Sequence, residues 1–248
     1  LKYEKDADTA ISQIHRQKYP DRLEHYKDNL ILIGINYDKE IKNDSVIPEL
    51  YGHACVDLGL PSGLLWATMN IGAESPWDYG TYFAWGETNS KSNYSWELYK
   101  WGDGETFTKY NADVDDTFGK VDNKQTLEKE DDAAAMNWGG NWRIPTSEEW
   151  AELCNKKNCT WLFTNQHGVN GQVVTSKING NSIFLPAAGV YYDKYVDLKG
   201  KHAEYWSSSL CKAVPYKAYI LSFGAGNVSC DEGNERRDGR PVRPVCQP

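Results

Sequence analysis

Long apolar runs are absent from this chain of 248 residues. Nothing approaches the roughly 18 consecutive apolar residues of a membrane-spanning helix, so no spanning segment is expected. Positive charge is also scarce, because 27 Lys and Arg residues stand against 35 Asp and Glu residues and the net charge is −8. Nucleic acids and anionic membranes both require a basic face, so neither is an expected partner. No internal repeat is evident.

Motifs of the common catalytic and metal centres are missing as well. There are no paired CxxC motifs, which argues against a structural zinc site. Ser207–Ser209 lies in an expected strand and not in the G-x-S-x-G turn of a serine hydrolase. Acidic residues are numerous, but nothing in the sequence selects the two carboxylates of a glycosidase. No catalytic residue is therefore assigned, and the chain is expected not to be an enzyme.

Aromatic residues are what the chain has in excess, with 10 Trp, 16 Tyr and 6 Phe. Together with 21 Gly and 10 Pro, they indicate a loop-rich fold in which aromatic side chains anchor irregular backbone. Charged residues at 25% and hydrophobic residues at 40% are typical of a folded, soluble protein. Because exposed Trp and Tyr rings stack on sugars, the candidate ligand-binding residues are Trp96, Trp101, Tyr191, Tyr192, Tyr205 and Trp206.

The expected fold is organised around residues 131–150. An alanine-rich run over 131–138 predicts a helix, and Gly139-Gly140 suits its C-terminus because glycine accepts a positive φ. Asp131 and Asp132 are expected in the first turn of this helix, where carboxylates meet the positive end of its dipole.

A second helix is expected directly afterwards. Residues 142–144 alternate as a short strand, and Thr146 with Glu149 three residues later predicts a capping box at a helix start. Arg143 is expected to pair with a buried acid such as Glu149, and Arg243 is expected to do the same.

The rest of the main domain predicts short strands and long loops. Residues 86–126 are polar and aromatic with little periodicity, so they are expected to be an irregular segment held by its own aromatic rings. Further strands are expected over 54–60, 64–68, 81–85, 173–175, 182–185, 205–208, 216–223, 228–230 and 242–245.

Residues 1–50 differ from the remainder, since they are charged, contain no Trp or Cys and have one Gly. Apolar residues at helical spacing predict an N-terminal helical extension, followed by the main domain over 51–248. Packing within the monomer is expected for its apolar face, and a dimer surface is the alternative.

The six cysteines permit fifteen disulfide patterns. Their spacing suggests one bond that closes a β-hairpin, one that joins the ends of the main domain and, by elimination, a third. Free buried thiols or a metal site are the alternatives for the third pair. The expected pairs are Cys211–Cys230, Cys55–Cys246 and Cys154–Cys159.

Two charged groups have weaker functional interpretations. Oxygen ligands in a loop suit a hard cation, so the calcium candidates are Asp113, Asp115, Asp116 and Asp122; otherwise no cofactor is expected. A basic group near the C-terminus is expected to form salt bridges to the acidic surface, with carboxylate binding as the alternative. It comprises Arg236, Arg237, Arg240 and Arg243.

Six separated motifs carry a resemblance to a known family. They are VDLGLPSGLLWATMNIGA, DYGTYFAWGET, VDNKQTLEKEDDAAAMNWGGNWRIPTSEEW, NGNSIFLPAAG, YWSSS and GRPVRPV. In this order they resemble the Fibrobacter succinogenes major paralogous domain family over residues 51–247. This resemblance implies an exported bacterial protein, in the periplasm or on the outer cell surface, either free or as a lipoprotein.

A more distant resemblance concerns DDAAAMNWGGNWRIPTSEEWAEL, which is similar to a segment of the formylglycine-generating, sulfatase-modifying family. That family implies an α+β, C-type-lectin-like fold with two helices, short antiparallel strands and much ordered loop. It also implies a copper oxidase that uses two cysteines five positions apart. The matching region here has Cys211, but Tyr216 occupies the second position, so this activity is expected to be lost.

The expected function is therefore non-catalytic binding of a glycan or of a cell-surface protein. An altered or degenerate copper oxidase is the first alternative, and a structural piece of a surface assembly is the second. The chain is expected to be a monomer or a dimer.

Overall fold

The computed structural model describes residues 48–113, 116–211 and 214–248. These belong to one compact unit, Pro48–Pro248. The predicted helical extension lies outside the described residues up to residue 47. Glu49 and Leu50 already form a strand of the unit, so its folded structure starts before the expected boundary at residue 51.

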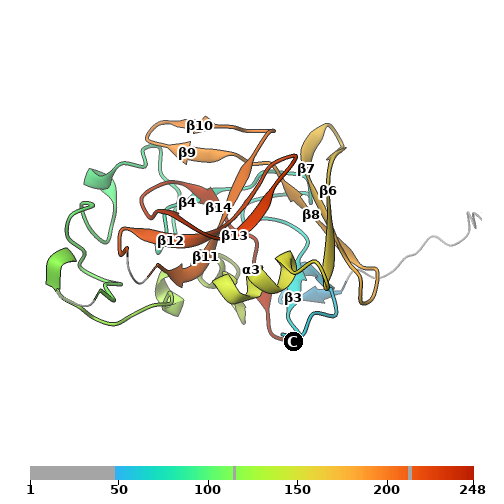
Figure 1. Ribbon diagram of the computed structural model, residues 1–248, viewed down its shortest axis with the longest axis horizontal. Coiled ribbons are helices and arrows are strands. Elements are labelled where there is room, and N and C mark those ends of the chain that lie inside the picture. Colours follow the sequence, from blue (N-terminus) through green and yellow to red (C-terminus); the bar gives the residue numbers. More distant parts are fainter. Residues whose placement is uncertain (1–47, 114–115, 212–213) are drawn as a thin grey trace, which may run out of the picture. The chain divides into compact units, whose positions relative to one another are not determined.

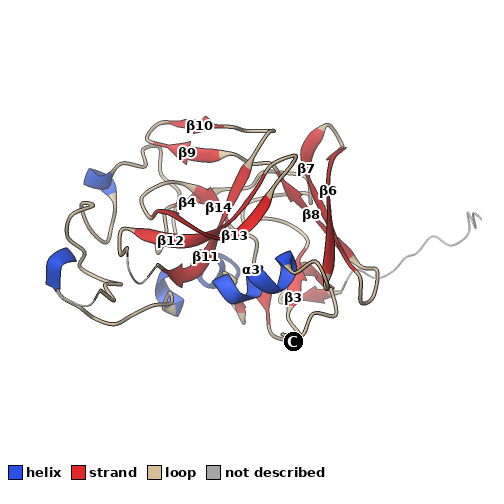
Figure 2. Cartoon of the chain, in the orientation of Figure 1, coloured by secondary structure: helices blue, strands red, loops and turns tan. Residues whose placement is uncertain are grey.

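Strands dominate the described residues, and two short α-helices accompany them (Figure 2). The chain is thus a mainly β member of the α+β class. The largest sheet has the order β1-β2-β3-β15-β5, all antiparallel. Its strands are β1 (Glu49–Leu50), β2 (His53–Asp57), β3 (Leu65–Ala67), β15 (Val245–Cys246) and β5 (Trp142–Arg143).

Four smaller sheets complete the unit, each of two or three strands (Figure 1). Two of them have three strands, in the orders β6-β7-β8 and β11-β12-β13, and two are the pairs β9-β10 and β4-β14. The bounds are β4 (Tyr82–Phe83), β6 (Cys159–Gln166), β7 (Val169–Ser176), β8 (Ser182–Pro186), β9 (Val190–Tyr192), β10 (Tyr195–Asp197), β11 (Ala203–Leu210), β12 (Lys217–Phe223), β13 (Val228–Glu235) and β14 (Arg240–Pro241).

The two predicted helices are confirmed, with small changes at their starts. The first, α2 (Ala133–Trp138), begins after Asp132, whose carboxylate accepts hydrogen bonds from the amides of Ala134 and Ala135. Asp131 lies in a preceding 3-10 turn, η4 (Lys129–Asp131). None of the described helices is both long and apolar enough to cross a membrane.

The second helix, α3 (Ser147–Cys154), has the predicted capping box between Thr146 and Glu149. Arg143 forms the expected ion pair with Glu149, with guanidinium nitrogens 2.5 and 2.7 Å from its two oxygens. This pair ties the strand before the helix to the first turn of α3.

The helix α3 packs against the sheet β11-β12-β13 (Figure 1). Fully buried tryptophans lie in the core of the unit. A buried indole N–H usually finds a hydrogen-bond acceptor, and three of these tryptophans do so across long stretches of the chain. Trp85 donates to the carbonyl of Ser207, and Trp150 donates to that of Trp206. Trp206 itself donates to the carbonyl of Phe83. These bonds fix distant segments of the chain to one another.

The long segment over 86–126 is irregular, as predicted, apart from the 3-10 turns η2 (Trp96–Leu98) and η3 (Asp116–Phe118) in its described residues. Its aromatic rings surround Arg236, which is fully buried. Arg236 donates to the hydroxyl of Tyr99 and to the carbonyls of Lys109, Tyr110 and Pro215. The expected surface salt bridge is therefore wrong for Arg236, which instead satisfies loop carbonyls in the interior.

The predicted closing strand over 242–245 is also wrong. Residues 240–241 form β14 and residues 245–246 form β15, with Arg243 between them. Arg243 is fully buried and donates to Asn70 Oδ1 and to the carbonyls of Ala67 and Phe184, so it pairs with no acid. An inward arginine and the flanking prolines interrupt the ladder, because proline donates no N–H.

Candidate functional site

Two of the six predicted ligand-binding aromatics lie in the core. Tyr205 and Trp206 have no exposed surface. The hydroxyl of Tyr205 donates to the carbonyl of Pro186 and accepts from Asn70. Neither ring can stack on a sugar, so this prediction is corrected. The sequence offered only a local cluster of aromatics, and burial depends on the sheets that cover them.

The other four are half-buried, and most of their ring surface contacts protein. Trp101 donates to the carbonyl of Gly86, and the ammonium of Lys100 lies 4.1 Å from its ring centroid. Trp96 packs edge-on against neighbouring rings. Tyr191 lies beside Tyr94, with ring centroids 4.8 Å apart. Burial raises the pKa of Tyr192. Trp96, Trp101 and Tyr191 therefore pack within or against the segment over 86–126.

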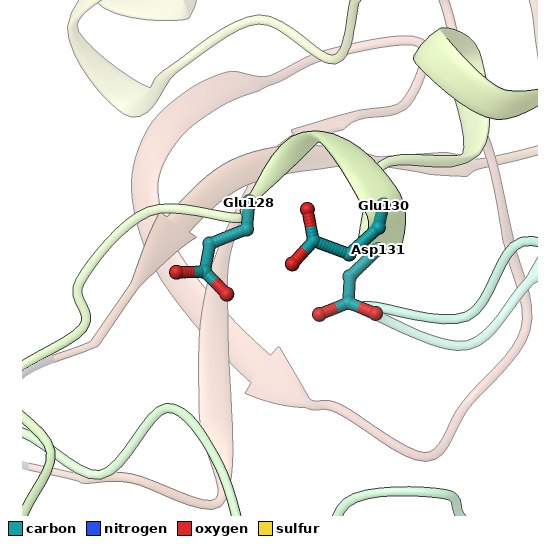
Figure 3. A group of neighbouring side chains, drawn as sticks. All are labelled: Glu128, Glu130 and Asp131. Carbon is teal, nitrogen blue, oxygen red and sulfur yellow. The ribbon is translucent and has the colours of Figure 1, made fainter.

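Three carboxylates converge where η4 meets the long segment (Figure 3). Glu128, Glu130 and Asp131 each offer an oxygen within 4.8 Å of the others. The ammonium of Lys109 contacts all three, at 2.5 Å from Glu128, 3.7 Å from Glu130 and 2.5 Å from Asp131. Lys109 therefore occupies the position that a metal ion would take.

The predicted calcium aspartates have other roles where they are described. Both oxygens of Asp122 accept backbone N–H groups, from Tyr110, Asn111 and Lys124. Asp116 accepts the amide of Val121. Asp113 does not join a group of three carboxylates, and Asp115 lies outside the described residues. Among the described residues, the three carboxylates that lie close enough together for a metal site are those around Lys109.

All six cysteines are free thiols, so the three expected disulfides are absent. Cys55 pairs with Ala67 on one side of β3, and Cys246 pairs with Leu65 on its other side. Two strand spacings, about 9–10 Å, separate them, which exceeds the reach of a disulfide.

The other expected pairs fail for similar reasons. The Sγ of Cys211 occupies the space that a Cβ on Gly233 would take. That position is three residues, or about 10 Å, along β13 from Cys230. The thiol of Cys154 is hydrogen-bonded to that of Cys230 and not to Cys159.

Cys211 lines a polar cavity of about 680 Å³ at the N-terminus of α3. Ser209 and Lys217 line it too, and Ser209 accepts the backbone N–H of Ser147. Burial raises the pKa of the Cys211 thiol to about 11, although Lys217 lowers it slightly. No second cysteine lines this cavity. A single protonated thiol lacks the two thiolates that Cu(I) prefers.

A different cavity combines aromatic walls with polar groups. It has a volume of about 620 Å³ and lies on one face of β6 and β7. Trp161 and Phe163 of β6 share this face, because side chains two apart in a strand point the same way. Gln172 of β7 lies directly opposite Phe163 in the antiparallel register. The cavity floor is therefore built from two half-buried rings and a buried amide.

Gln172 has an unused hydrogen-bond acceptor. It is 3% exposed, and its Nε2 donates to the carbonyl of Gly224 at 2.9 Å. This bond fixes the amide orientation, and Oε1 then accepts no hydrogen bond. A buried polar atom without a partner costs about 1–3 kcal/mol. Because Gln172 lines the cavity, a ligand hydroxyl or a water that reached Oε1 after a small side-chain movement would remove that cost.

The walls come from two other parts of the chain. Residues 225–227 of the β12–β13 turn and Val228 of β13 form one wall, and Cys154 and Lys156 at the C-terminal end of α3 form another. The charged residues that line the cavity are Lys156 and Lys177. In a chain of net charge −8, this cavity is locally cationic.

Sequence reasoning missed this site, although a signal was present. Cys159, Trp161 and Phe163 alternate with Thr160 and Leu162, the period of a strand with one covered face. That pattern predicts β6, but it does not show that Gln172 faces the same side. The unpaired oxygen of Gln172 depends on pairing with β7 and on the β12–β13 turn.

No protein-family model matches this chain, and neither do any curated protein or solved structure.

Proposed function

We propose that this chain is a non-catalytic, exported binding domain that holds an acidic glycan in the cavity formed by β6, β7, α3 and the β12–β13 turn. The observation that carries the proposal is the unpaired Oε1 of Gln172 beside two half-buried aromatic rings. A sugar supplies what is missing, since its hydroxyls donate to a carbonyl oxygen and its C–H face covers a ring.

The charge of the lining supports an acidic sugar over a neutral one. Lys156 and Lys177 are both exposed, so their ammonium groups are accessible to a ligand. A carboxylate or sulfate on the ligand would meet positive charge here. Repulsion from the acidic surface elsewhere would oppose binding at other places on the protein.

A C-type-lectin-like fold fits the topology. The strand β15 near the C-terminus pairs with β3 near the start of the unit, so the two ends of the unit lie side by side. The two helices α2 and α3 follow one another within residues 133–154. Much of the remaining chain, including the described parts of 86–126, is ordered loop.

The copper-oxidase alternative has less support. Cys211 stands without a second thiol in its cavity, and the raised pKa of about 11 keeps it protonated at neutral pH. The second alternative is a structural role in a surface assembly through residues 1–50. Of these residues, the structure describes 48–50.

The proposal is tested by titrating purified protein with a matched pair of oligosaccharides, one bearing uronic acid groups and one with those groups reduced to alcohols. Calorimetry on the wild type should show binding of the acidic member. The variants Trp161→Leu and Gln172→Leu should weaken it at least tenfold, because each removes one of the two predicted contacts.

Two controls separate lost binding from lost folding. Trp96→Ala removes a half-buried tryptophan from another surface and should leave the affinity unchanged. Circular dichroism and the melting temperature establish that each variant is folded. Absence of binding to an array of acidic and neutral glycans would refute the proposal. Equal weakening of binding by Trp96→Ala would show that the ligand does not bind specifically in this cavity.

A further inference from the structure

Two cysteines far apart in the sequence meet where α3 packs on β13. Cys154 is the last residue of α3, and Cys230 is the third residue of β13. Both side chains are half-buried against the same core cluster. Their thiols are hydrogen-bonded to each other. Because the end of α3 packs on β13, the two sulfur atoms lie close together.

A bulge in β13 produces this arrangement. Ile220 of β12 pairs with Glu232, and Ser222 pairs with Ser229, so one extra residue is inserted on β13 between these pairs. A bulge re-aims the side chains of its strand. Cys230 lies inside this bulge, at the part of β13 next to the end of α3.

We propose that Cys154 and Cys230 form a disulfide bond when the protein meets a disulfide oxidant, and that this bond joins α3 to β13. The oxidant is another disulfide, either that of an exported thiol oxidoreductase or that of oxidised glutathione. The expected pairs Cys211–Cys230 and Cys154–Cys159 are replaced by this one. The inference does not depend on whether the cavity binds a glycan.

The chemistry requires two exchange steps. The Cys230 thiolate attacks one sulfur of the oxidant, which forms a mixed disulfide and releases one thiol. Cys154 then loses its proton and attacks the Sγ of Cys230, which forms the internal disulfide and releases the second thiol. Two protein thiols are oxidised and one disulfide of the oxidant is reduced to two thiols.

The interaction between the thiols favours one order of these steps. It lowers the pKa of Cys230, and together with burial it raises the pKa of Cys154. The thiolate is the attacking species, so Cys230 is the first nucleophile. Cys154 becomes the second once Cys230 is in the mixed disulfide.

The bond would also fix one wall of the glycan cavity. Cys154 lines that cavity, and Cys230 follows residues 225–228, which also line it. Joining the two walls would hold the cavity in one shape in an oxidising compartment.

The test uses the full chain, reduced and then incubated with oxidised glutathione under native conditions. Non-reducing proteolysis and mass spectrometry should find one linked pair of peptides, containing Cys154 and Cys230. The mass should fall by two hydrogen atoms, and a reductant should restore it. A linked pair that involves Cys159 or Cys211, or no linked pair, would overturn the inference.

Variants give a second readout. Oxidation should raise the melting temperature of the wild type by roughly 5–15 °C, because the bond restricts the unfolded chain. Cys159→Ser, a neighbouring cysteine, should keep this shift. Cys154→Ser and Cys230→Ser should abolish it, and a shift that persists in either one would contradict the proposed pair.

Discussion

Asp238 lies 3.3 Å from the guanidinium of Arg240, yet its second oxygen, Oδ1, accepts no hydrogen bond. The nearest cation to that oxygen is Arg237, at 3.7 Å. Arg240 is fully buried and is shared with a second carboxylate, since it also contacts Glu204 at 2.7 Å. Two buried carboxylates therefore share one guanidinium, yet their pKa values differ.

The pKa values move in opposite directions. Burial raises the pKa of Asp238 to about 6, against the effect of Arg240 and Arg237. Burial would also raise the pKa of Glu204, but Arg240 and His202 lower it to about 2. Ionised Glu204 thus stabilises the fold above its unfolded pKa, and this contribution is lost as the pH falls toward 2.

Asp238→Asn should raise the free energy of unfolding at pH 7. The raised pKa of Asp238 means that its protonated form favours folding below pH 3.8 and that this contribution disappears as the pH rises through 6. The shift corresponds to up to about 3 kcal/mol. Urea unfolding from pH 4 to 7 should show the variant gaining stability over the wild type as the pH rises. The contribution of Glu204 is present in both proteins, so it cancels in the difference between their unfolding free energies. A difference that does not change with pH would contradict this assignment.

Asp132→Ala should cost about 2–4 kcal/mol of unfolding free energy. One oxygen of Asp132 accepts the amides of Ala134 and Ala135, and the other accepts the amide of Ile144. Removing the carboxylate leaves three buried donors unpaired. Chemical denaturation measures the loss, and Glu130→Ala, at an exposed neighbour, should change stability by less than about 0.5 kcal/mol. Equal losses in the two variants would refute this role.

Calcium should not stabilise the wild-type protein through the carboxylates of Figure 3, because the ammonium of Lys109 already contacts all three. Lys109→Met should lower the melting temperature, since it leaves the buried carboxylate of Asp131 with fewer cations. Millimolar calcium should restore part of that loss. Lys124→Met, which removes a cation that contacts Glu128 alone, is the matched control and should show little effect. Calcium stabilisation of the wild type equal to that of Lys109→Met would contradict the assignment.

The charge of the proposed glycan cavity can be tested separately from its shape. A double variant, Lys156→Gln with Lys177→Gln, should weaken binding of an acidic oligosaccharide about five- to thirtyfold, or about 1–2 kcal/mol. Added salt should weaken wild-type binding in the same direction, because screening acts on exposed charges. The equivalent change at Lys120 and Lys194, two exposed lysines that do not line the cavity, should leave affinity unchanged. If both double variants lose affinity equally, only the net charge matters and the cavity is not involved.

Local features of the sequence predicted the elements around α2 and α3 well. The capping box of Thr146 and Glu149, and the ion pair of Arg143 with Glu149, join residues within six positions of one another. Such contacts form with few alternatives, because the backbone itself brings the partners together. The irregular segment over 86–126 was likewise predictable from its lack of periodicity.

Residues whose partners lie far along the chain were predicted poorly. Arg236 was expected in a surface salt bridge and Arg243 beside a buried acid, yet both are buried and bond to carbonyls of distant segments. The cysteine pairing failed because it depends on which strand separates two thiols and on a bulge in β13. Neither the intervening strand nor the bulge can be inferred from the spacing of the cysteines in the sequence.

The sequence alone thus determined the composition, the acidity, the two helices and the alternation that makes β6. Tertiary structure decided which aromatics are buried, which thiols meet, and that Gln172 shares a cavity with Trp161 and Phe163. The physical reason is that burial and side-chain direction follow from strand register, and register is set by packing between segments distant in sequence.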